Sequence, residues 1–118
     1  MIKVIHIIGL VGAGKTHFID RHFPEIPQTF DIKTVYEQSQ FEPGDLHNNP
    51  KAYEKFMQAM DSSFKYFIEN MQSLGFEYVV CESTGTNAAM NSTLRPYKPY
   101  VLWIEPDQYR MENTYLRE

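Results

Sequence analysis

Short apolar runs alternate with amphipathic segments along the chain. The runs at residues 2–8, 77–82 and 100–105 are rich in β-branched and aromatic residues and are typical of strands covered on two faces. A weaker run at residues 28–32, with an acidic residue near its end, predicts a further short strand, the second along the chain. Because strands that alternate with helices form βαβ units, we expect an α/β fold, a three-layer sandwich around a parallel sheet.

The clearest predicted helix follows Asn49 and Pro50, a capping residue and a residue suited to the first helical turn. Aromatic residues and methionines then recur at spacings of three and four until Gly75, which supplies the stop. We expect this apolar face in the core; it consists of Tyr53, Phe56, Met57, Met60, Phe64, Phe67, Ile68 and Met71.

The remaining segments predict shorter elements. Helices are expected at residues 16–23, before Pro24, at residues 87–94 and at residues 107–116. Residues 33–48 are polar and turn-rich, which favours a surface loop with room for one helical turn.

Composition limits the kinds of protein that this chain can be. Its 118 residues are enough for one domain, residues 1–118, and leave no room for a separate substrate domain. The net charge of -4 gives no global attraction to polyanions, so a long nucleic acid is a less expected partner than a small molecule. A single cysteine, Cys81, suits a reducing compartment, and we expect a cytoplasmic protein. Lys3 and the apolar run after it could be taken for a secretory signal, but His6 interrupts the run and no span is long enough to cross a membrane.

Residues 9–16, with the sequence GLVGAGKT, match the phosphate-binding pattern G-x-x-x-x-G-K-[ST]. Glycines at these positions let backbone N–H groups point at phosphate oxygens, and a following helix adds its positive end. We expect Lys15 on the β- and γ-phosphates and the Thr16 hydroxyl on Mg²⁺. The alternative is a glycine-rich turn that carries Lys-Thr by chance; an apolar strand before it and a helix after it favour the phosphate loop. The predicted nucleotide-binding residues are Gly9, Val11, Gly12, Ala13, Gly14, Lys15, Thr16 and His17.

Three acidic residues, Asp31, Glu82 and Glu105, come at the ends of predicted strands, where parallel sheets bind their ligands. Glu82 leads into Ser83, Thr84 and a glycine, and its carboxylate could bind the hydration shell of Mg²⁺ or a substrate hydroxyl. In the alternative interpretation, Ser83 or Thr84 only caps backbone N–H groups.

Asp31 is a candidate for the group that accepts the proton of an attacking hydroxyl, although aspartates also end strands for ordinary turn reasons. Tyr36 follows in the predicted loop. It is either part of an acceptor pocket or an exposed loop tyrosine.

Taken together, the phosphate loop and three further segments resemble the small P-loop kinases, the branch with zeta-toxin-like kinases, polynucleotide 5′-kinases and nucleoside or nucleotide kinases. The further segments are Phe30-Asp31, residues 79–85 (VVCESTG) and residues 103–106 (WIEP), and the resemblance extends from Met1 to the last residue. It implies the strand order 2-3-1-4, a general base or acceptor ligand at Asp31, and an acceptor beside the turn that contains Thr84.

The resemblance also implies a lid helix whose arginines reach the phosphates, for which Arg110 and Arg117 are the available positions. Their alternative is a solvated helix face, because Glu112 and Glu118 are close in sequence. Most members of the family continue with a complete lid, a fifth strand and an adenine-contacting loop, which are not found in these residues. The guanine-reading pattern of GTPases is also absent, so ATP is the expected nucleotide.

Two functions follow from these residues. The first is an ATP-dependent kinase that moves the γ-phosphoryl of Mg-ATP to a small acceptor such as a nucleoside or nucleotide, with Lys15, Asp31 and Arg110 as catalytic residues. The second is an ATP-binding regulatory or interaction module with little transferase activity. The acceptor, the oligomeric state and the physiological role stay open.

Overall fold

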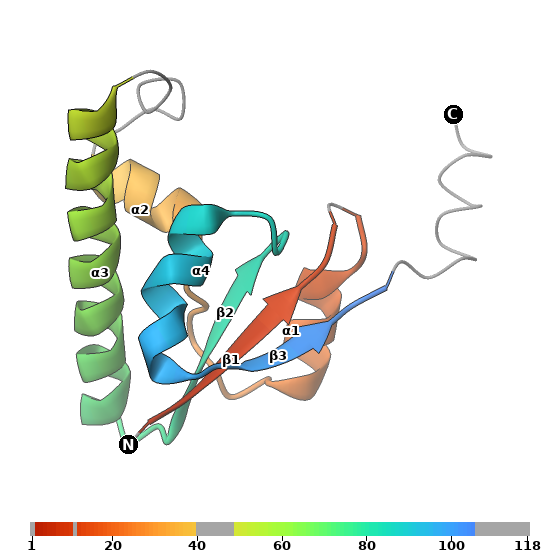
Figure 1. Cartoon of the computed structure of the whole chain (residues 1–118). Helices are drawn as coiled ribbons and strands as arrows, with labels where there is room; N and C mark the ends of the chain where they lie inside the picture. The colour runs from red at the N-terminus through yellow and green to blue at the C-terminus, as the bar shows by residue number, and fades with distance from the viewer. Residues whose placement is uncertain (1, 11, 40–48, 106–118) are drawn as a thin grey trace.

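The computed structural model describes residues 2–10, 12–39 and 49–105. Its sheet consists of β1 (Lys3–Ile8), β2 (Tyr78–Ser83) and β3 (Tyr100–Trp103) in the order β2-β1-β3 (Figure 1). Both pairings are parallel, and β1 is in register with β2 along its whole length, from Lys3 opposite Tyr78 to Ile8 opposite Ser83. The parallel sheet and three of the predicted strands are therefore confirmed.

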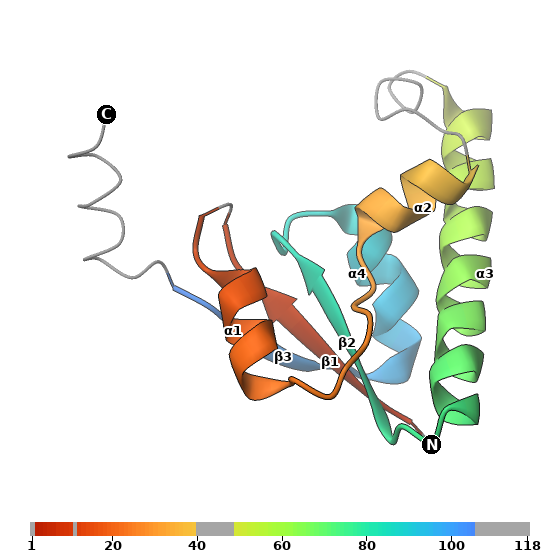
Figure 2. The same ribbon diagram turned by 180° about the vertical axis from the view of Figure 1, so that it is seen from behind.

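Helices cover both faces of this sheet. The helix α1 (Lys15–His22) lies on one face, while α3 (Pro50–Ser73) and α4 (Ala88–Leu94) lie on the other (Figures 1 and 2). A further helix, α2 (Ile32–Ser39), packs against α3, and the short 3-10 helix η2 (Arg95–Tyr97) follows α4. The architecture is α/β, as the alternation of segments predicts.

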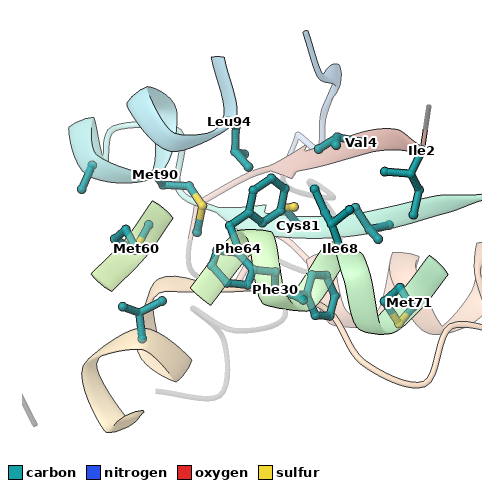
Figure 3. Close-up of a cluster of buried hydrophobic side chains, with 14 of the residues drawn as sticks. Ile2, Val4, Phe30, Met60, Phe64, Ile68, Met71, Cys81, Met90 and Leu94 are labelled. Carbon is teal, nitrogen blue, oxygen red and sulfur yellow. The ribbon is translucent and has the colours of Figure 1, made fainter. Parts of the chain in front are cut away.

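The long helix α3 builds most of the core. Asn49 caps it by accepting a hydrogen bond from the Ala52 N–H at 3.1 Å, and Pro50 opens its first turn. Six residues of the predicted apolar face are buried, namely Phe56, Met60, Phe64, Phe67, Ile68 and Met71, whereas Tyr53 is exposed. They pack against strand residues such as Val4 and Cys81 and against α4, as Figure 3 shows. The opposite face has a much smaller cluster, formed by Ile7, Ile19 and Val80.

The predicted strand at residues 28–32 is wrong. Phe30 makes a single parallel bridge to Cys81, with its N–H on the Val80 carbonyl at 2.9 Å. The chain then turns, because an Asp31 carboxylate oxygen accepts the Thr34 N–H at 3.0 Å and so starts α2 at Ile32. The predicted surface loop at residues 33–48 is also wrong in its first part, which is two turns of helix; residues 40–48 lie outside the described residues.

The expectation that residues 100–105 are covered on both faces is wrong as well. All four residues of β3 are exposed, from 41% for Leu102 to 63% for Tyr100. The reason is position, since β3 is an edge strand that pairs with β1 alone within the described part of the chain. The helix predicted at residues 107–116, with Arg110 and Arg117, lies outside the described residues.

Candidate functional site

The glycine-rich loop connects the buried strand β1 to the first turn of α1. Gly12 and Gly14 have φ angles of 85° and 92°, in the left-handed region that glycine adopts without strain. Gly14 is the residue before α1, and no side chain caps this helix end. Since the first N–H groups of a helix have no partner inside it, they stand at the end of the loop as donors for an anion. Val11 lies outside the described residues.

Gly9 begins the loop at a place that is tight for any side chain. A Cβ atom there would lie 3.0 Å from the Ile104 carbonyl oxygen and 3.2 Å from Cγ of Lys15. The Ile104 N–H donates to the Ile8 carbonyl at 2.7 Å, so the end of β3 holds the loop against β1. The Lys15 side chain therefore passes directly over the first glycine.

The Lys15 amine lies at the carboxyl end of β2. Its Nζ donates to the Ser83 carbonyl at 3.2 Å, and the Gly9 N–H donates to the same oxygen at 3.2 Å. Thr16 and His17 follow on the first turn of α1, and both are exposed. The loop, the lysine and the predicted magnesium hydroxyl thus share one edge of the sheet.

Glu82, one of the predicted site carboxylates, lies near the end of β2 in the same region. It is half-buried, and burial raises the pKa of its carboxyl, with further upward contributions from the negative charges of Asp31 and Asp20. The Lys15 charge acts in the opposite direction and favours the ionised form. One cation and two other carboxylates are therefore close enough to influence the Glu82 carboxyl.

Sequence reasoning missed Asp20. It lies four residues after Thr16 on α1, a spacing that places the two on the same side of the helix. This spacing of four is the feature of the sequence that indicates Asp20, because residues four apart on a helix lie on the same side of it.

Asp31 has a structural role in addition to its position beside Glu82. Its Oδ1 accepts the Thr34 N–H at 3.0 Å and the Thr34 hydroxyl at 3.2 Å, so it caps α2. The Glu82 N–H donates to the Phe30 carbonyl at 3.0 Å, which fixes the backbone of Asp31 next to the end of β2. The ordinary turn role foreseen for this aspartate is thus present at one of its two carboxylate oxygens.

Several hydrogen bonds hold the turn after β2. The Gly85 N–H donates to Ser83 Oγ at 3.0 Å, and the Thr84 and Thr86 hydroxyls lie 3.0 Å apart. Gly85 has a φ of 86°, and a Cβ atom there would collide with the Ile8 side chain, so only glycine fits. The cap of α4 comes later, from the Asn87 side chain, rather than from Ser83 or Thr84.

Tyr36 is neither exposed nor part of a loop. It lies on α2, is half-buried, and stacks on Phe56 of α3 with ring centroids 4.8 Å apart. Burial raises the pKa of its phenol, with a smaller contribution from Tyr53. Its contacts are those of a residue that joins α2 to α3, and they give it no evident link to the loop.

A cavity of about 190 Å³ lies beside the loop. Its lining comes from the start of α1 and the end of β3 and includes Gly14, His17, Phe18, Arg21 and Glu105. Within the described ranges, no group of three or more histidine, cysteine or acidic side chains is arranged to hold a metal ion.

No protein-family model matches the chain, and no curated protein is found to be similar to it in sequence. In the part of the chain that the structure describes, no helix is both long and apolar enough to span a membrane.

Proposed function

We propose that the protein binds Mg-ATP at the loop of residues 9–16 and transfers its γ-phosphoryl group to a small hydroxyl or phosphate acceptor, such as a nucleoside or nucleotide. The observation that carries this proposal is the position of Lys15, whose amine lies over the end of β2 within electrostatic reach of Glu82, itself coupled to Asp31. A loop with the phosphate-binding pattern and two candidate acid-base groups therefore meet at one sheet edge.

The loop residues supply the binding contacts. Backbone N–H groups at the start of α1 bind phosphate oxygens, and the Lys15 amine exchanges the Ser83 carbonyl for the β- and γ-phosphates. Thr16 and Glu82 fit a magnesium ion that arrives with the nucleotide, because such an ion takes most of its six ligands from phosphates and water. Bound Mg²⁺ would neutralise charge on the phosphates.

Asp31 is the candidate base in this proposal. Its Oδ1 is committed to the cap of α2, which leaves Oδ2 to accept the acceptor's hydroxyl proton. The acceptor oxygen bonds to the γ-phosphorus as the bond between that phosphorus and the bridging oxygen of ADP breaks. The products are ADP, the phosphorylated acceptor and a proton on Asp31.

The strand order supports the resemblance on which this proposal draws. If the Phe30 bridge is counted as the second strand, the order along the sheet becomes Phe30, β2, β1 and β3, which corresponds to 2-3-1-4.

A second candidate is an ATP-binding regulatory or interaction module with little transfer activity. The capping role of Asp31 favours it, because a carboxylate held by Thr34 has a sufficient structural reason to be there. The two candidates share the loop and differ in whether Asp31 contacts an acceptor.

The test is ATP turnover with and without a panel of nucleosides, nucleotides and 5′-hydroxyl oligonucleotides. We expect one acceptor class to stimulate turnover, and Asp31→Asn to lower kcat by roughly two to four orders of magnitude with little change in ATP affinity. Asparagine keeps the cap of α2, since it is as good a capping residue as aspartate, so the loss would be chemical.

Asn49→Ala is the matched control, because it removes the cap of α3 without touching the loop. It should cost about 1 kcal/mol of stability and leave turnover unchanged. Turnover that no acceptor stimulates would favour the binding module, whereas acceptor-stimulated turnover that survives in Asp31→Asn would place the base at another residue.

A further inference from the structure

His6 is a buried polar side chain in the middle of the apolar strand β1. Only 2% of it is exposed, and its strand neighbours are Cys81 on β2 and Val101 on β3. Its Nε2 lies 2.7 Å from Oγ of Ser83, a residue 77 positions away at the end of β2. This hydrogen bond ties the centre of the sheet to the edge where the candidate site lies.

Ser83 connects His6 to the loop through both its side chain and its backbone. Its Oγ bonds to His6 and accepts the Gly85 N–H, and its carbonyl accepts the Gly9 N–H and the Lys15 amine. One residue thus holds the start of the loop, the loop lysine and the turn after β2. A change in the Ser83 side-chain conformation would break the bond to the Gly85 N–H and so loosen the turn after β2, next to the carbonyl that accepts from Gly9 and Lys15.

The surroundings of His6 keep its imidazole neutral. Burial lowers the pKa of His6, and the nearby Lys15 charge lowers it further. An open groove of about 450 Å³ beside it is lined by two more cations, Arg95 and Lys98, together with Asn91 and apolar residues. No carboxylate lines the described part of this groove, so nothing there would stabilise an imidazolium.

The pattern of donors fixes the orientation of Ser83. The Gly85 N–H donates to one lone pair of Ser83 Oγ. A single hydrogen lies between His6 Nε2 and Ser83 Oγ, donated by the imidazole or by the hydroxyl according to the tautomer of His6. Two directional bonds from different elements hold the Ser83 side chain in one position.

We propose that His6 is a positioning residue for the nucleotide site: through the Ser83 side chain it holds the turn that carries Thr84 beside the phosphate loop. This inference rests on the proposed function, because it assigns a purpose to the loop that His6 supports. His6 itself does not touch the nucleotide.

The test compares His6→Phe, His6→Gln and Ser83→Ala with the wild type in Mg-ATP titrations. Phenylalanine keeps a ring and loses the hydrogen bond, so affinity should fall by roughly three- to tenfold, the equivalent of one hydrogen bond. Ser83→Ala should give a similar loss, and the double variant should be no weaker than the weaker single variant. Glutamine offers a polar group at the reach of Nε2, and we expect it to recover most of the affinity.

Thr93→Val is the control for a purely structural effect. It also removes a partly buried hydrogen bond, from the buried Thr93 to Asp61 Oδ1 at 2.8 Å, but between α4 and α3, away from the loop. Urea unfolding should show a loss of stability for this variant, while its Mg-ATP affinity stays that of the wild type. If His6→Phe and Ser83→Ala also keep wild-type affinity, the positioning role is wrong.

A readout without nucleotide separates this inference from the proposed function. Amide hydrogen exchange of Gly9 and Gly85 should be faster in His6→Phe and Ser83→Ala than in the wild type or Thr93→Val. If the wild type does not bind Mg-ATP but these amides respond, the proposed function fails and His6 still positions the turn. Unchanged exchange at both amides would overturn the positioning role. If His6→Phe does not fold, the Gly9 amide in Ser83→Ala decides the outcome, because this variant removes the acceptor of the Gly85 N–H directly but keeps the acceptor of the Gly9 N–H.

Discussion

The two faces of the sheet differ greatly in how much they bury. Among the described residues, fifteen buried ones form a single cluster on the side of α3 and α4, whereas three do so on the side of α1. The first face provides most of the apolar burial that stabilises the fold. The second face packs α1 against the sheet through the smaller cluster. The start of α1 carries N–H groups and the Lys15 amine at the sheet edge.

The largest expected difference between the two faces is in the stability lost when a large buried side chain is replaced by alanine. Phe64 is fully buried and packs with the rings of Phe30, Phe67 and Tyr97, so Phe64→Ala should lower the free energy of unfolding by about 3–5 kcal/mol. Ile19 belongs to the small cluster, and Ile19→Ala should cost only about 2 kcal/mol, the lower end for such a change. Urea unfolding measures both. An Ile19→Ala cost equal to that of Phe64→Ala would remove the difference between the faces.

A smaller and pH-dependent effect should come from Glu82 at the edge. Burial and the charges of Asp31 and Asp20 raise the pKa of Glu82 in the folded protein above its ordinary value of 4.5. The folded state therefore favours the protonated carboxyl, and this contribution to stability is lost as the pH rises through the folded pKa. Glu82→Gln should be more stable than the wild type at neutral pH and equal to it below pH 4.5.

Unfolding curves of both proteins between pH 4 and pH 8 would measure this difference. Glu69→Gln, a change at an exposed position on α3, is the control and should follow the wild type across the range. A Glu82→Gln variant that is less stable than the wild type at neutral pH would mean that the carboxylate is stabilised at this edge.

The elements with strong local signals could be predicted from the sequence, and the contacts and exposure that depend on distant residues could not. Asn49, Pro50 and Gly75 bracket α3, and its spacing of three and four fixes the buried face. The strand at residues 28–32 was wrong because the cap that Asp31 forms with Thr34 outweighs a weak apolar run. The exposure of β3 could not be predicted from its own residues, since an apolar sequence occurs both in edge strands and in central strands of a sheet.

In the candidate site too, residues with a local sequence pattern could be predicted and residues that depend on distant partners could not. The loop of residues 9–16 has a fixed spacing and could be found directly, and the end of β2 was found because Glu82 closes an apolar run. In the sequence His6 is only an interruption in an apolar strand, because its partner Ser83 is 77 positions away and no local pattern joins them. The exposed-loop interpretation of Tyr36 is wrong because the helix that carries it has no strong local signal, while its place in an acceptor pocket stays a prediction.

The most direct test of the central claim is calorimetric titration of Mg-ATP into the wild type, Lys15→Ala and Lys65→Ala. Lys65 is exposed on α3, so its variant removes one positive charge far from the loop. We expect the wild type and Lys65→Ala to bind equally and Lys15→Ala to bind at least about tenfold more weakly, since a charge-assisted contact to phosphate is lost, with its unfolding curve little changed. Equal affinity in all three proteins, or no binding by the wild type, would contradict the assignment of residues 9–16 as a phosphate loop.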